Sequence, residues 1–294
     1  GGETSSSITI NEDGTVGLTL GTPDIGGSRA SMAMMASEEL GIPMEKIKPV
    51  IGDTNSLGFN FLTGGSRATF STGTTVVKST REAIEELKKR AALLWEVTLE
   101  QVEWIDGHAR LISGNEPKTM SLSQIAKQAG KTGGPIMANC SMNVTGAGPS
   151  LGTHIVDVEV DEETGRVSIV RYTAIQDAGK AIHPAYVEGQ LQGGAVQGIG
   201  WALNEEYIYN DKGELENTGF LDYRIPVCSD VPMIDTVIVE VPNPNHPYGV
   251  RGVGETPIIP PLAAISNAVS RATNKRFTEL PLSPPKVLAK LMHG

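Results

Sequence analysis

The placement of glycine limits the fold of this chain more than any other feature of its sequence. The chain has 34 glycines among 294 residues, and they lie in short clusters rather than in one linker-like tract. The clusters fall at the ends of predicted strands, where the backbone must adopt positive φ or approach another group closely. The sequence therefore predicts a folded protein whose glycine-rich loops make tight turns or pack closely against another group of atoms.

The charge and composition exclude several classes of protein. Acidic residues outnumber basic ones, 34 to 24, and the formal net charge of -10 argues against nucleic acid as a partner. No uninterrupted apolar run approaches the ~20 residues of a membrane helix, so we expect no membrane association. The two cysteines, Cys140 and Cys228, form no Cys-x-x-Cys motif, so we expect neither a zinc knuckle nor an iron–sulfur cluster on this chain. The low cysteine content and the lack of a signal peptide favour the cytoplasm.

The hydrophobic pattern mixes strands and helices without strict alternation. Apolar and polar residues alternate on both sides of a turn at residues 8–20 and again at 102–112, which predicts two hairpins. A helix is expected at 29–40, and an apolar stripe predicts a longer one at 75–96. We therefore expect an α+β fold with mixed β-sheets and packed helices, not a doubly wound sheet.

The two halves of the chain resemble each other loosely. The first half reads as strand, acidic turn ending in glycine, strand, a loop with Asp24, and helix, and the second half repeats this order with Asp177 in the loop. We interpret the halves as two related α/β subdomains, 1–150 and 151–294, the second carrying a Gln-rich helix and a glutamate loop. A coincidence between two hairpins is the alternative.

Two loops combine glycines, hydroxyl side chains and one arginine. They are residues 21–29, GTPDIGGSR, and residues 63–69, TGGSRAT. Successive backbone N–H groups in such a turn form an anion-binding nest, and Thr69 adds a hydroxyl donor. The phosphate of a dinucleotide or pterin would suit both loops, and the alternative is two ordinary polar turns.

A glycine-rich stretch lies within a predicted helix. Residues 189–200 contain five glycines, each of which costs about 1 kcal/mol of helix stability relative to alanine. Close helix packing would explain these glycines. It explains less well the amides of Gln190, Gln192 and Gln197, because buried amides require hydrogen-bond partners. A ligand rich in oxo and amide groups would supply them.

One glutamate stands at the end of a glycine-rich loop. Glu255 follows Gly249, Gly252 and Gly254 and precedes an apolar, proline-rich stretch. We expect apolar neighbours to bury this carboxylate and raise its pKa toward the range of a general base. The alternative is a solvated loop glutamate. Arg251 in the same loop either faces the site or braces the loop through a salt bridge.

Together these segments resemble the second molybdopterin-binding domain of the xanthine dehydrogenase and aldehyde oxidase family of molybdenum hydroxylases. The most specific motifs are DAGKAIHPAYVEGQLQGGAVQGIGWAL at residues 177–203 and YGVRGVGETPIIPP at residues 248–261. The loops GTPDIGG and TGGSRAT support the resemblance, which runs from about Ile8 to Leu291.

The resemblance implies roles for individual residues. It makes Glu255 the catalytic base beside molybdenum, and it places Gln197 by the oxo ligands of the metal. The pterin dithiolene holds the molybdenum in this family, so the resemblance implies no protein ligand to the metal. The residues that it assigns to cofactor binding are Gly26, Gly27, Ser28, Gly65, Ser66, Arg67, Ala68, Thr69, Gln190, Gln197 and Gly254.

Two departures from the family pattern bear on this interpretation. The family commonly has a glutamine in the first loop that contacts the pterin, and this sequence has Gly27 there, which offers no side chain. The first molybdenum domain of the family, with much of the substrate pocket, is absent. The resemblance therefore implies a partner subunit or domain that carries the first molybdenum-binding half. It also implies an iron–sulfur subunit with 2Fe-2S clusters and an FAD subunit.

The resemblance also implies an activity, the hydroxylation of a carbon next to nitrogen or oxygen with water as the oxygen source. The cofactor would be molybdenum-molybdopterin in its cytosine dinucleotide form, and the substrate an N-heterocycle such as nicotinate or a purine. Aldehyde oxidation is the alternative activity. Two non-catalytic alternatives are a cofactor-assembly subunit and a phosphate-binding module. The presence of Glu255 argues against the first, which needs no base, and the Gln-rich helix argues against the second, which has no use for it.

Overall fold

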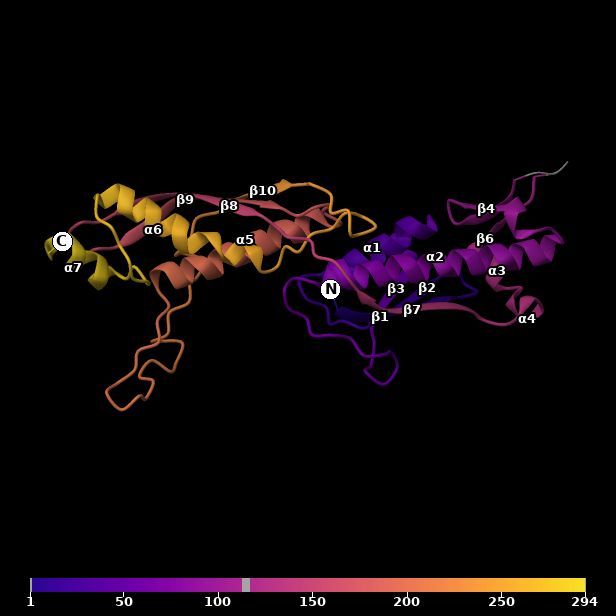
Figure 1. The fold of residues 1–294 in the computed structure, drawn as a ribbon, viewed down its shortest axis with the longest axis horizontal. Helices are drawn as coiled ribbons and strands as arrows, with labels where there is room; N and C mark the ends of the chain where they lie inside the picture. The colour runs from indigo at the N-terminus through magenta and orange to yellow at the C-terminus, as the bar shows by residue number, and fades with distance from the viewer. Residues whose placement is uncertain (1, 113–116, 294) are drawn as a thin grey trace. The chain divides into compact units, whose positions relative to one another are not determined.

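The structure, a computed structural model, describes residues 2–112 and 117–293 (Figure 1). Its contacts divide the chain into two compact units. Unit 1 comprises Gly1–Gly148 and Pro242–Val250, and unit 2 comprises Pro149–Val241 and Arg251–Gly294. The loop at 242–250 thus belongs to unit 1, although its neighbours in sequence belong to unit 2. The predicted division of labour between two subdomains stays a prediction.

Unit 1 is built around a mixed sheet and two long helices. Its elements are β1 (Gly2–Ile10), β2 (Val16–Leu20), α1 (Ser28–Leu40), the 3-10 helix η1 (Met44–Lys46), β3 (Ile47–Ile51), α2 (Ala68–Trp95), the 3-10 helix η2 (Leu99–Gln101), β4 (Val102–Ile105), β5 (His108–Leu111), β6 (Thr119–Ser121), α3 (Leu122–Ala126), α4 (Ala129–Thr132) and β7 (Ile136–Val144). The main sheet has the order β3-β2-β1-β7, with β2 and β3 parallel and the other pairs antiparallel. Helix α2 packs against α1, β1 and β7.

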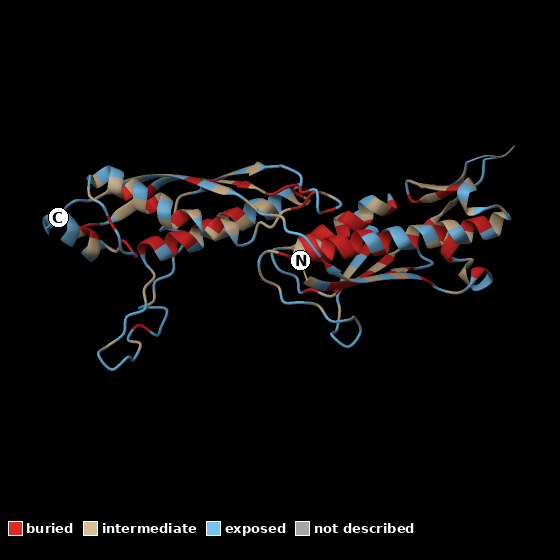
Figure 2. Cartoon of the chain, viewed as in Figure 1, coloured by how far each residue is buried: buried red, intermediate tan, exposed pale blue. Residues whose placement is uncertain are grey.

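The longest helix begins about two turns before its predicted start. Helix α2 starts at Ala68, and its first turns are rich in threonine and serine. These small side chains are buried against β1, where the hydroxyl oxygens of Thr72 and Thr4 lie 3.1 Å apart, as do those of Ser79 and Ser6. Figure 2 shows this buried N-terminal part of α2 in red. Threonine and serine are weak helix formers, so tertiary packing supplies what the hydrophobic periodicity does not indicate.

A smaller sheet of unit 1 has the order β4-β5-β6. Its first hairpin turns at Asp106 and Gly107, both at positive φ, as the Asp-Gly pair predicts. Ser121 caps α3 through a bond from the backbone N–H of Gln124. Gln128 leaves the helical conformation and separates α3 from α4.

Unit 2 consists of a three-stranded sheet with helices packed against it. Its elements are β8 (Gly152–Val160), β9 (Val167–Asp177), α5 (Pro184–Leu203), β10 (Ile234–Val239), the 3-10 helix η3 (Thr256–Ile258), α6 (Pro260–Thr273) and α7 (Pro284–His293). The sheet order is β10-β9-β8, with β9 and β10 parallel. Tyr172 of β9, Leu191 and Ile199 of α5, and Ile265 of α6 meet in its buried core.

The two units share the same order and pairing of elements, as the loose resemblance between the two halves of the sequence predicts. In unit 1, the antiparallel hairpin β1-β2 is followed by α1 and then by β3, which returns parallel to β2. In unit 2, the hairpin β8-β9 is followed by α5 and then by β10, which returns parallel to β9. Mixed sheets with packed helices in two related α/β subdomains are thus the observed fold class.

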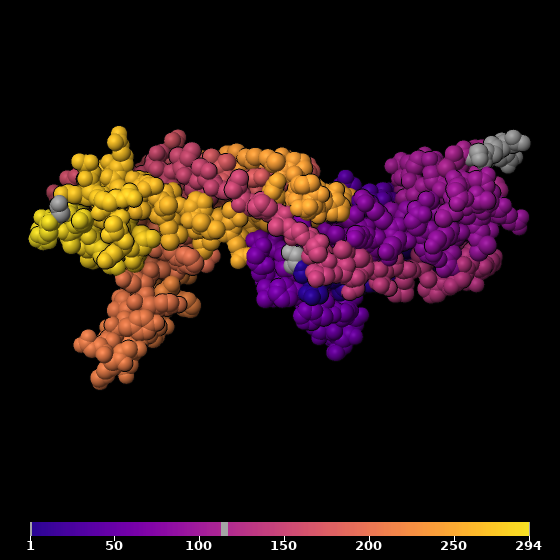
Figure 3. All heavy atoms as spheres, viewed as in Figure 1, coloured from indigo at the N-terminus to yellow at the C-terminus, as the bar shows by residue number. Residues whose placement is uncertain are grey.

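Unit 2 also carries an arm of little regular structure at residues 204–233, which extends downward in orange in Figure 3. The buried side chain of Asn217 holds the arm, since its Oδ1 accepts the backbone N–H of Ile208 and its Nδ2 donates to the carbonyl of Glu206. Large apolar side chains stand out from it nevertheless. Phe220 is 90% exposed and Leu221 93% exposed.

Two expectations from composition concern the described residues. No helix among them is long and apolar enough to cross a membrane. Neither cysteine is in a disulfide, and Cys140 is half-buried whereas Cys228, which lies on the arm, is exposed.

Candidate functional site

In unit 1, helices α1 and α2 run side by side in the same direction. Near the end of α1, Glu39 forms an ion pair with Arg81 of α2, with 2.8 Å between Arg81 Nε and Glu39 Oε2. Nearer the start of both helices, a Cβ added to Gly73 of α2 would lie 2.8 Å from Cε of Met35 in α1. Because the contacts advance together along both helices, the two N-termini lie at the same end of the unit. The structure therefore brings the two predicted anion-binding turns to one end of unit 1.

The first turn uses much of its own hydrogen-bonding capacity. Gly26 and Gly27 have φ of 60° and 75°, and Gly27 caps α1 without a side-chain hydrogen bond. Ser28 is buried, and its Oγ accepts the backbone N–H of Ile25 at 3.3 Å. The carboxylate of Asp24 accepts the backbone N–H of Arg29 and pairs with its guanidinium. This acidic group reduces the positive potential of the turn, so it is the poorer of the two anion sites.

The second turn is the better candidate for an anion. Gly65 and Ser66 are consecutive residues at positive φ, 65° and 55°, and α2 begins after Arg67 with no side-chain cap. A residue at positive φ next to one in the right-handed region, as Ser66 is next to Arg67, aims successive N–H groups at one point, which is the geometry of a nest. A Cβ added to Gly65 would meet nothing within 4 Å. Ser71, one turn further, has a buried Oγ with no hydrogen-bond partner among the described residues. The turn is thus open at Gly65, and within the described residues the buried hydroxyl of Ser71 is unpaired.

Arg67, which the resemblance assigns to the cofactor, is 95% buried and holds the loop before α2. Its Nη1 donates to the carbonyls of Phe61 and Leu62 at 2.9 and 3.2 Å, and its Nη2 donates to the carbonyl of Glu3 at 2.9 Å. Burial lowers the pKa of this guanidinium from its usual value. The bonds to carbonyls indicate that Arg67 shapes the nest, whatever else it contacts.

The loop at 242–250 packs against the start of α2 within unit 1. His246 is 5% exposed, and a Cβ added to Gly73 would lie 3.2 Å from its Nε2. Its Nδ1 accepts the backbone N–H of Tyr248 at 3.0 Å. Burial lowers the pKa of His246 to about 4, so the ring is neutral at pH 7. Sequence reasoning missed this residue, because a histidine between two prolines carries no signal of burial.

In unit 2, one face of the Gln-rich helix α5 is closed by packing. A Cβ added to Gly194 would lie 2.7 Å from Cβ of Pro257, and one added to Gly198 would lie 2.5 Å from Cγ of Pro261. Only glycine lets η3 and the start of α6 approach this closely. For these two glycines, close packing is therefore the correct explanation.

A second face of α5, about 100° around the helix from the first, is open. A Cβ added to Gly189 or Gly193 would meet nothing within 4 Å. Gln197 lies one turn beyond Gly193 on the same face and is exposed, and Trp201 one turn further is 43% exposed. Gln190 is half-buried beside this face. Two glycines that pack against nothing, followed by an exposed amide, form a shallow face on which a flat polar ligand could lie.

The glutamate loop lies against α5, because Pro257 touches Gly194. Glu255 is therefore brought near the helix that carries Gln190 and Gln197. The expectation that apolar neighbours bury its carboxylate is wrong for this chain: Glu255 and Gly254 are both exposed. The physical reason is local, since Glu255 precedes the short helix η3 and only Pro257 in that helix is directed into the core.

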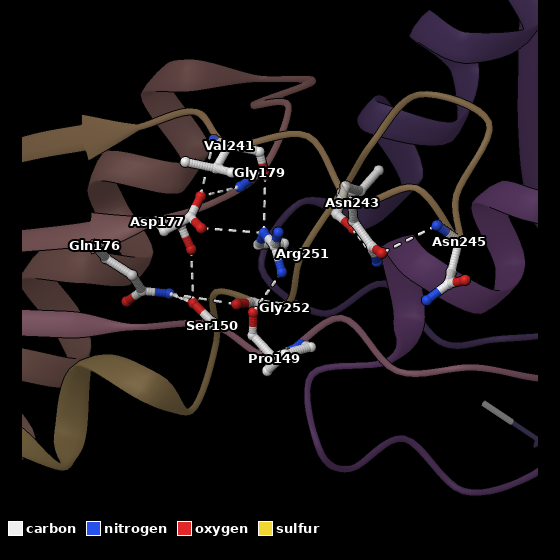
Figure 4. Close-up of polar contacts among 11 residues, drawn as sticks. Pro149, Ser150, Gln176, Asp177, Gly179, Val241, Asn243, Asn245, Arg251 and Gly252 are labelled. Atoms are coloured by element: carbon white, nitrogen blue, oxygen red, sulfur yellow. Dashed lines mark hydrogen bonds and ion pairs between the residues drawn. The ribbon is translucent and has the colours of Figure 1, made fainter.

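Arg251 braces the base of the glutamate loop, which was one of the two alternatives from sequence (Figure 4). Its Nε lies 3.1 Å from Oδ2 of Asp177, and both side chains are mostly buried. Nε also donates to the carbonyl of Val241, and Nη1 donates to the carbonyl of Pro149. Asp177 was not predicted as a site residue, although its place in the repeated loop could have indicated it.

The matched family identifies what these features share. Residues 1–232 match the model of the molybdopterin cofactor-binding domain. The chain belongs to this family. The membership confirms the resemblance to the molybdenum hydroxylases that the motifs indicated.

Individual relatives agree with this family. The xanthine dehydrogenase molybdenum-binding subunit of Escherichia coli O157:H7 is 32% identical over 95% of this chain and 38% of its own length. The nicotine 6-hydroxylase large subunit of Paenarthrobacter nicotinovorans is 31% identical over 97% of the chain and 36% of its own length. The structure of quinoline 2-oxidoreductase from Pseudomonas putida 86 matches with a TM-score of 0.87 and 27% identity, over 99% of this chain and 38% of that one. The chain spans less than two fifths of the length of these relatives.

Each unit, taken by itself, has a feature that fits part of a molybdopterin cofactor. In unit 1, the turn before α2 leaves open space at Gly65, where a Cβ would meet nothing within 4 Å. In unit 2, the exposed amide of Gln197 lies on α5 beyond Gly189 and Gly193, where a Cβ would also meet nothing. Within residues 2–112 and 117–293, no three His, Cys, Asp or Glu side chains are placed to hold a metal ion.

Proposed function

We propose that this chain is the second cofactor-binding part of the molybdenum-binding subunit of a molybdenum hydroxylase. The complete enzyme would hydroxylate a carbon next to nitrogen or oxygen with water as the oxygen source. The observation that carries the proposal is the approach of the Glu255 loop to the Gln197-bearing helix, through the contact of Pro257 with Gly194. A cofactor-assembly subunit would have no use for a carboxylate held at this place.

For the substrate, we propose an N-heterocycle such as nicotinate or a purine. The relatives with 31–32% identity are named for xanthine and nicotine, whereas the aldehyde oxidoreductase subunit of Escherichia coli is 27% identical. Aldehyde oxidation is the second candidate, supported by that same relative over 98% of the chain.

The residues of each unit would serve the cofactor differently. In unit 1, the backbone at Gly26, Gly27, Ser28, Gly65, Ser66, Ala68 and Thr69 would bind its anionic groups, with Arg67 shaping the second turn. In unit 2, Gln190, Gln197 and Gly254 would contact its polar edge. The bound cofactor, which we propose is the cytosine dinucleotide form, supplies two-electron redox chemistry. Glu255 would accept the proton released when water is the oxygen source.

Partners are part of the proposal. The chain spans 38% of its relative from Escherichia coli, so we propose a subunit or domain that carries the first molybdenum-binding half. The apolar side chains of the arm support this, because Phe220 and Leu221 are about nine-tenths exposed and the arm is acidic. We further propose 2Fe-2S and FAD subunits as electron acceptors, and the cytoplasm as the location.

The test of the function is Glu255→Gln in the complex purified with its partner subunits. We expect turnover of xanthine or nicotinate with a dye acceptor to fall by about 10²–10⁴-fold, because a general base contributes that much. Molybdenum per chain should be unchanged. Glu162→Gln, which alters an exposed turn, is the matched control. Turnover above a tenth of wild type, or an absence of molybdenum from the wild-type complex, would refute the assignment.

The cofactor site has its own test in Arg67→Ala. We expect molybdenum and released nucleotide per chain to fall several-fold, because the loop that shapes the nest loses its bonds to Phe61, Leu62 and Glu3. Arg81→Ala is the control. Arg81 lies farther along α2, is exposed, and forms an ion pair with Glu39 of α1. Equal cofactor content in the two variants would contradict a role for the second turn.

A further inference from the structure

We propose that Asp177 and Arg251 are positioning residues that hold the loop bearing Glu255 in its working place. The inference rests on the proposed role of Glu255 as the base. All the contacts that carry it lie within unit 2, and Figure 4 shows them together.

The guanidinium of Arg251 gathers separate segments of the chain. Besides its ion pair with Asp177, Nε lies 2.9 Å from the carbonyl oxygen of Val241, and Nη1 lies 2.7 Å from that of Pro149. The side chain is 13% exposed, so solvent screens these contacts little. A planar fork with several fixed donors suits this task, and a lysine could not make all the contacts at once.

Asp177 divides its two carboxylate oxygens between the backbone and the arginine. Oδ1 accepts the backbone N–H of Gly179 at 2.9 Å and that of Val241 at 3.1 Å, while Oδ2 faces Arg251. The backbone N–H of Arg251 donates to the carbonyl of Ala178 at 3.0 Å. Arg251, at the start of the glutamate loop, is thus fixed to the end of β9 by both its side chain and its backbone.

The next residue of the loop is held as well. The carbonyl of Gly252 accepts a bond from Nε2 of Gln176, which also donates to Oγ of Ser150. Gln176 is 1% exposed, and Ser150 donates to the carbonyl of Asp177. Two consecutive loop residues therefore bond to the same strand end.

The far end of the loop has a different anchor. Pro257 is buried and lies against Gly194 of α5. Glu255 stands between this anchor and Gly252, in a stretch without regular structure before η3. Glu255 lies in no strand or helix, so the backbone that carries it is held on either side by these two anchors. A displacement of about 1 Å costs on the order of 10²-fold in rate when a catalytic group must meet its substrate.

Unit 2 offers a matched control for this pair. Arg171 and Asp157 also form an ion pair, with 2.9 Å between Nε and Oδ2, but their side chains are 67% and 51% exposed. The pair joins β8 and β9 rather than the glutamate loop. Replacing Arg171 removes the same charge from the same unit without loosening the proposed brace.

The experiment compares Arg251→Met, Arg251→Lys and Asp177→Asn with Arg171→Met in the purified complex. We expect hydrogen exchange of the backbone amides at 251–256 to accelerate about tenfold in Arg251→Met and Asp177→Asn and not in Arg171→Met. Turnover should follow, with kcat falling about tenfold to a hundredfold, KM changing less than about twofold, and molybdenum content staying constant. Arg251→Lys should fall between these variants and wild type.

The outcomes separate the inference from the function on which it rests. Full turnover in Glu255→Gln would refute the proposed function. Loss of turnover in Glu255→Gln together with unchanged kcat and unchanged exchange in both Arg251→Met and Asp177→Asn would overturn the positioning role. Faster exchange with unchanged kcat would overturn it too. If Arg251→Met does not fold, Arg251→Lys and Asp177→Asn decide the question.

Discussion

The two repeats of this protein each place an aspartate between the end of the second strand and the helix, and use it in opposite ways. Asp24 in unit 1 pairs with Arg29, five residues later, and this pair is 32% and 51% exposed. Asp177 in unit 2 pairs with Arg251, which is distant in sequence, and this pair is 14% and 13% exposed. Asp24 stabilises a local turn, whereas Asp177 joins segments that are far apart in the chain.

The difference shows that a repeated loop does not carry a repeated role. The role depends on what reaches the aspartate from outside the repeat. In unit 2, residues 251–252 arrive after β10 and use the end of β9 as a fixed base. In unit 1, no arginine outside the repeat is seen at Asp24 among the described residues. Three comparisons, the first between these two aspartates, sharpen or break this interpretation.

The largest effect is expected at the aspartates themselves. Asp177→Ala should destabilise unit 2 by about 3–5 kcal/mol, because it leaves the buried guanidinium of Arg251 without its partner. Asp24→Ala should cost unit 1 at most about 1 kcal/mol, the usual value of an exposed pair. Hydrogen exchange resolved by peptide, measured in urea, reports the two units separately. Similar losses in both variants would mean that exposure does not distinguish the pairs.

The second comparison concerns the two faces of α5. Gly194→Ala should destabilise by about 2 kcal/mol, because its Cβ would lie 2.7 Å from Cβ of Pro257. Gly193→Ala, one residue earlier, should stabilise the helix by about 1 kcal/mol, because its Cβ meets open space. Thermal unfolding of the two variants checks the sign. If the open face holds the cofactor, Gly193→Ala should also lower molybdenum content, which Gly194→Ala would not do selectively.

The third comparison is one of pH, since each unit contains one buried neutral histidine. Burial lowers the pKa of His154 in unit 2 and of His246 in unit 1 to about 4, below the ordinary value of 6.5. The unfolded chain therefore takes up the proton first as pH falls, so the stability present above pH 6.5 is lost between 6.5 and 4. The loss should approach about 1.4 kcal/mol for each pH unit and each histidine.

Substitution of each histidine assigns this slope to its unit. His246→Asn should flatten the pH dependence of unit 1 only, and His154→Asn that of unit 2 only, because asparagine can still accept one hydrogen bond and does not titrate. Urea unfolding at pH 7 and pH 5, followed by hydrogen exchange, measures both. A slope that survives in both single variants would show that other groups govern the acid response.

Local pattern carried much of the fold. Alternation and the turn residues predicted the hairpins of β1-β2 and β4-β5, and the repeated order of elements predicted the matching topology of the two units. The start of α2 was not predictable, because its threonines favour other conformations until they pack against β1, where Thr72 meets Thr4. Hydrophobic periodicity indicates only the part of a helix that buries apolar residues. The contact between the start of α2 and β1 is polar, so periodicity does not reveal it.

For the site, the sequence by itself determined the family and the segments that carry its motifs. The glycines, glutamines and glutamate of these motifs are recognised by their order along the sequence, for which no fold is needed. Only the tertiary structure decided what each residue does within those segments. It showed that Gly194 serves packing whereas Gly193 faces open space, and that Glu255 is exposed on this chain. It also showed that Arg251 braces its loop through Asp177. The physical reason is that burial, a close approach and an ion pair all depend on which residues lie near one another in space. The residues that meet in this way are far apart in the sequence.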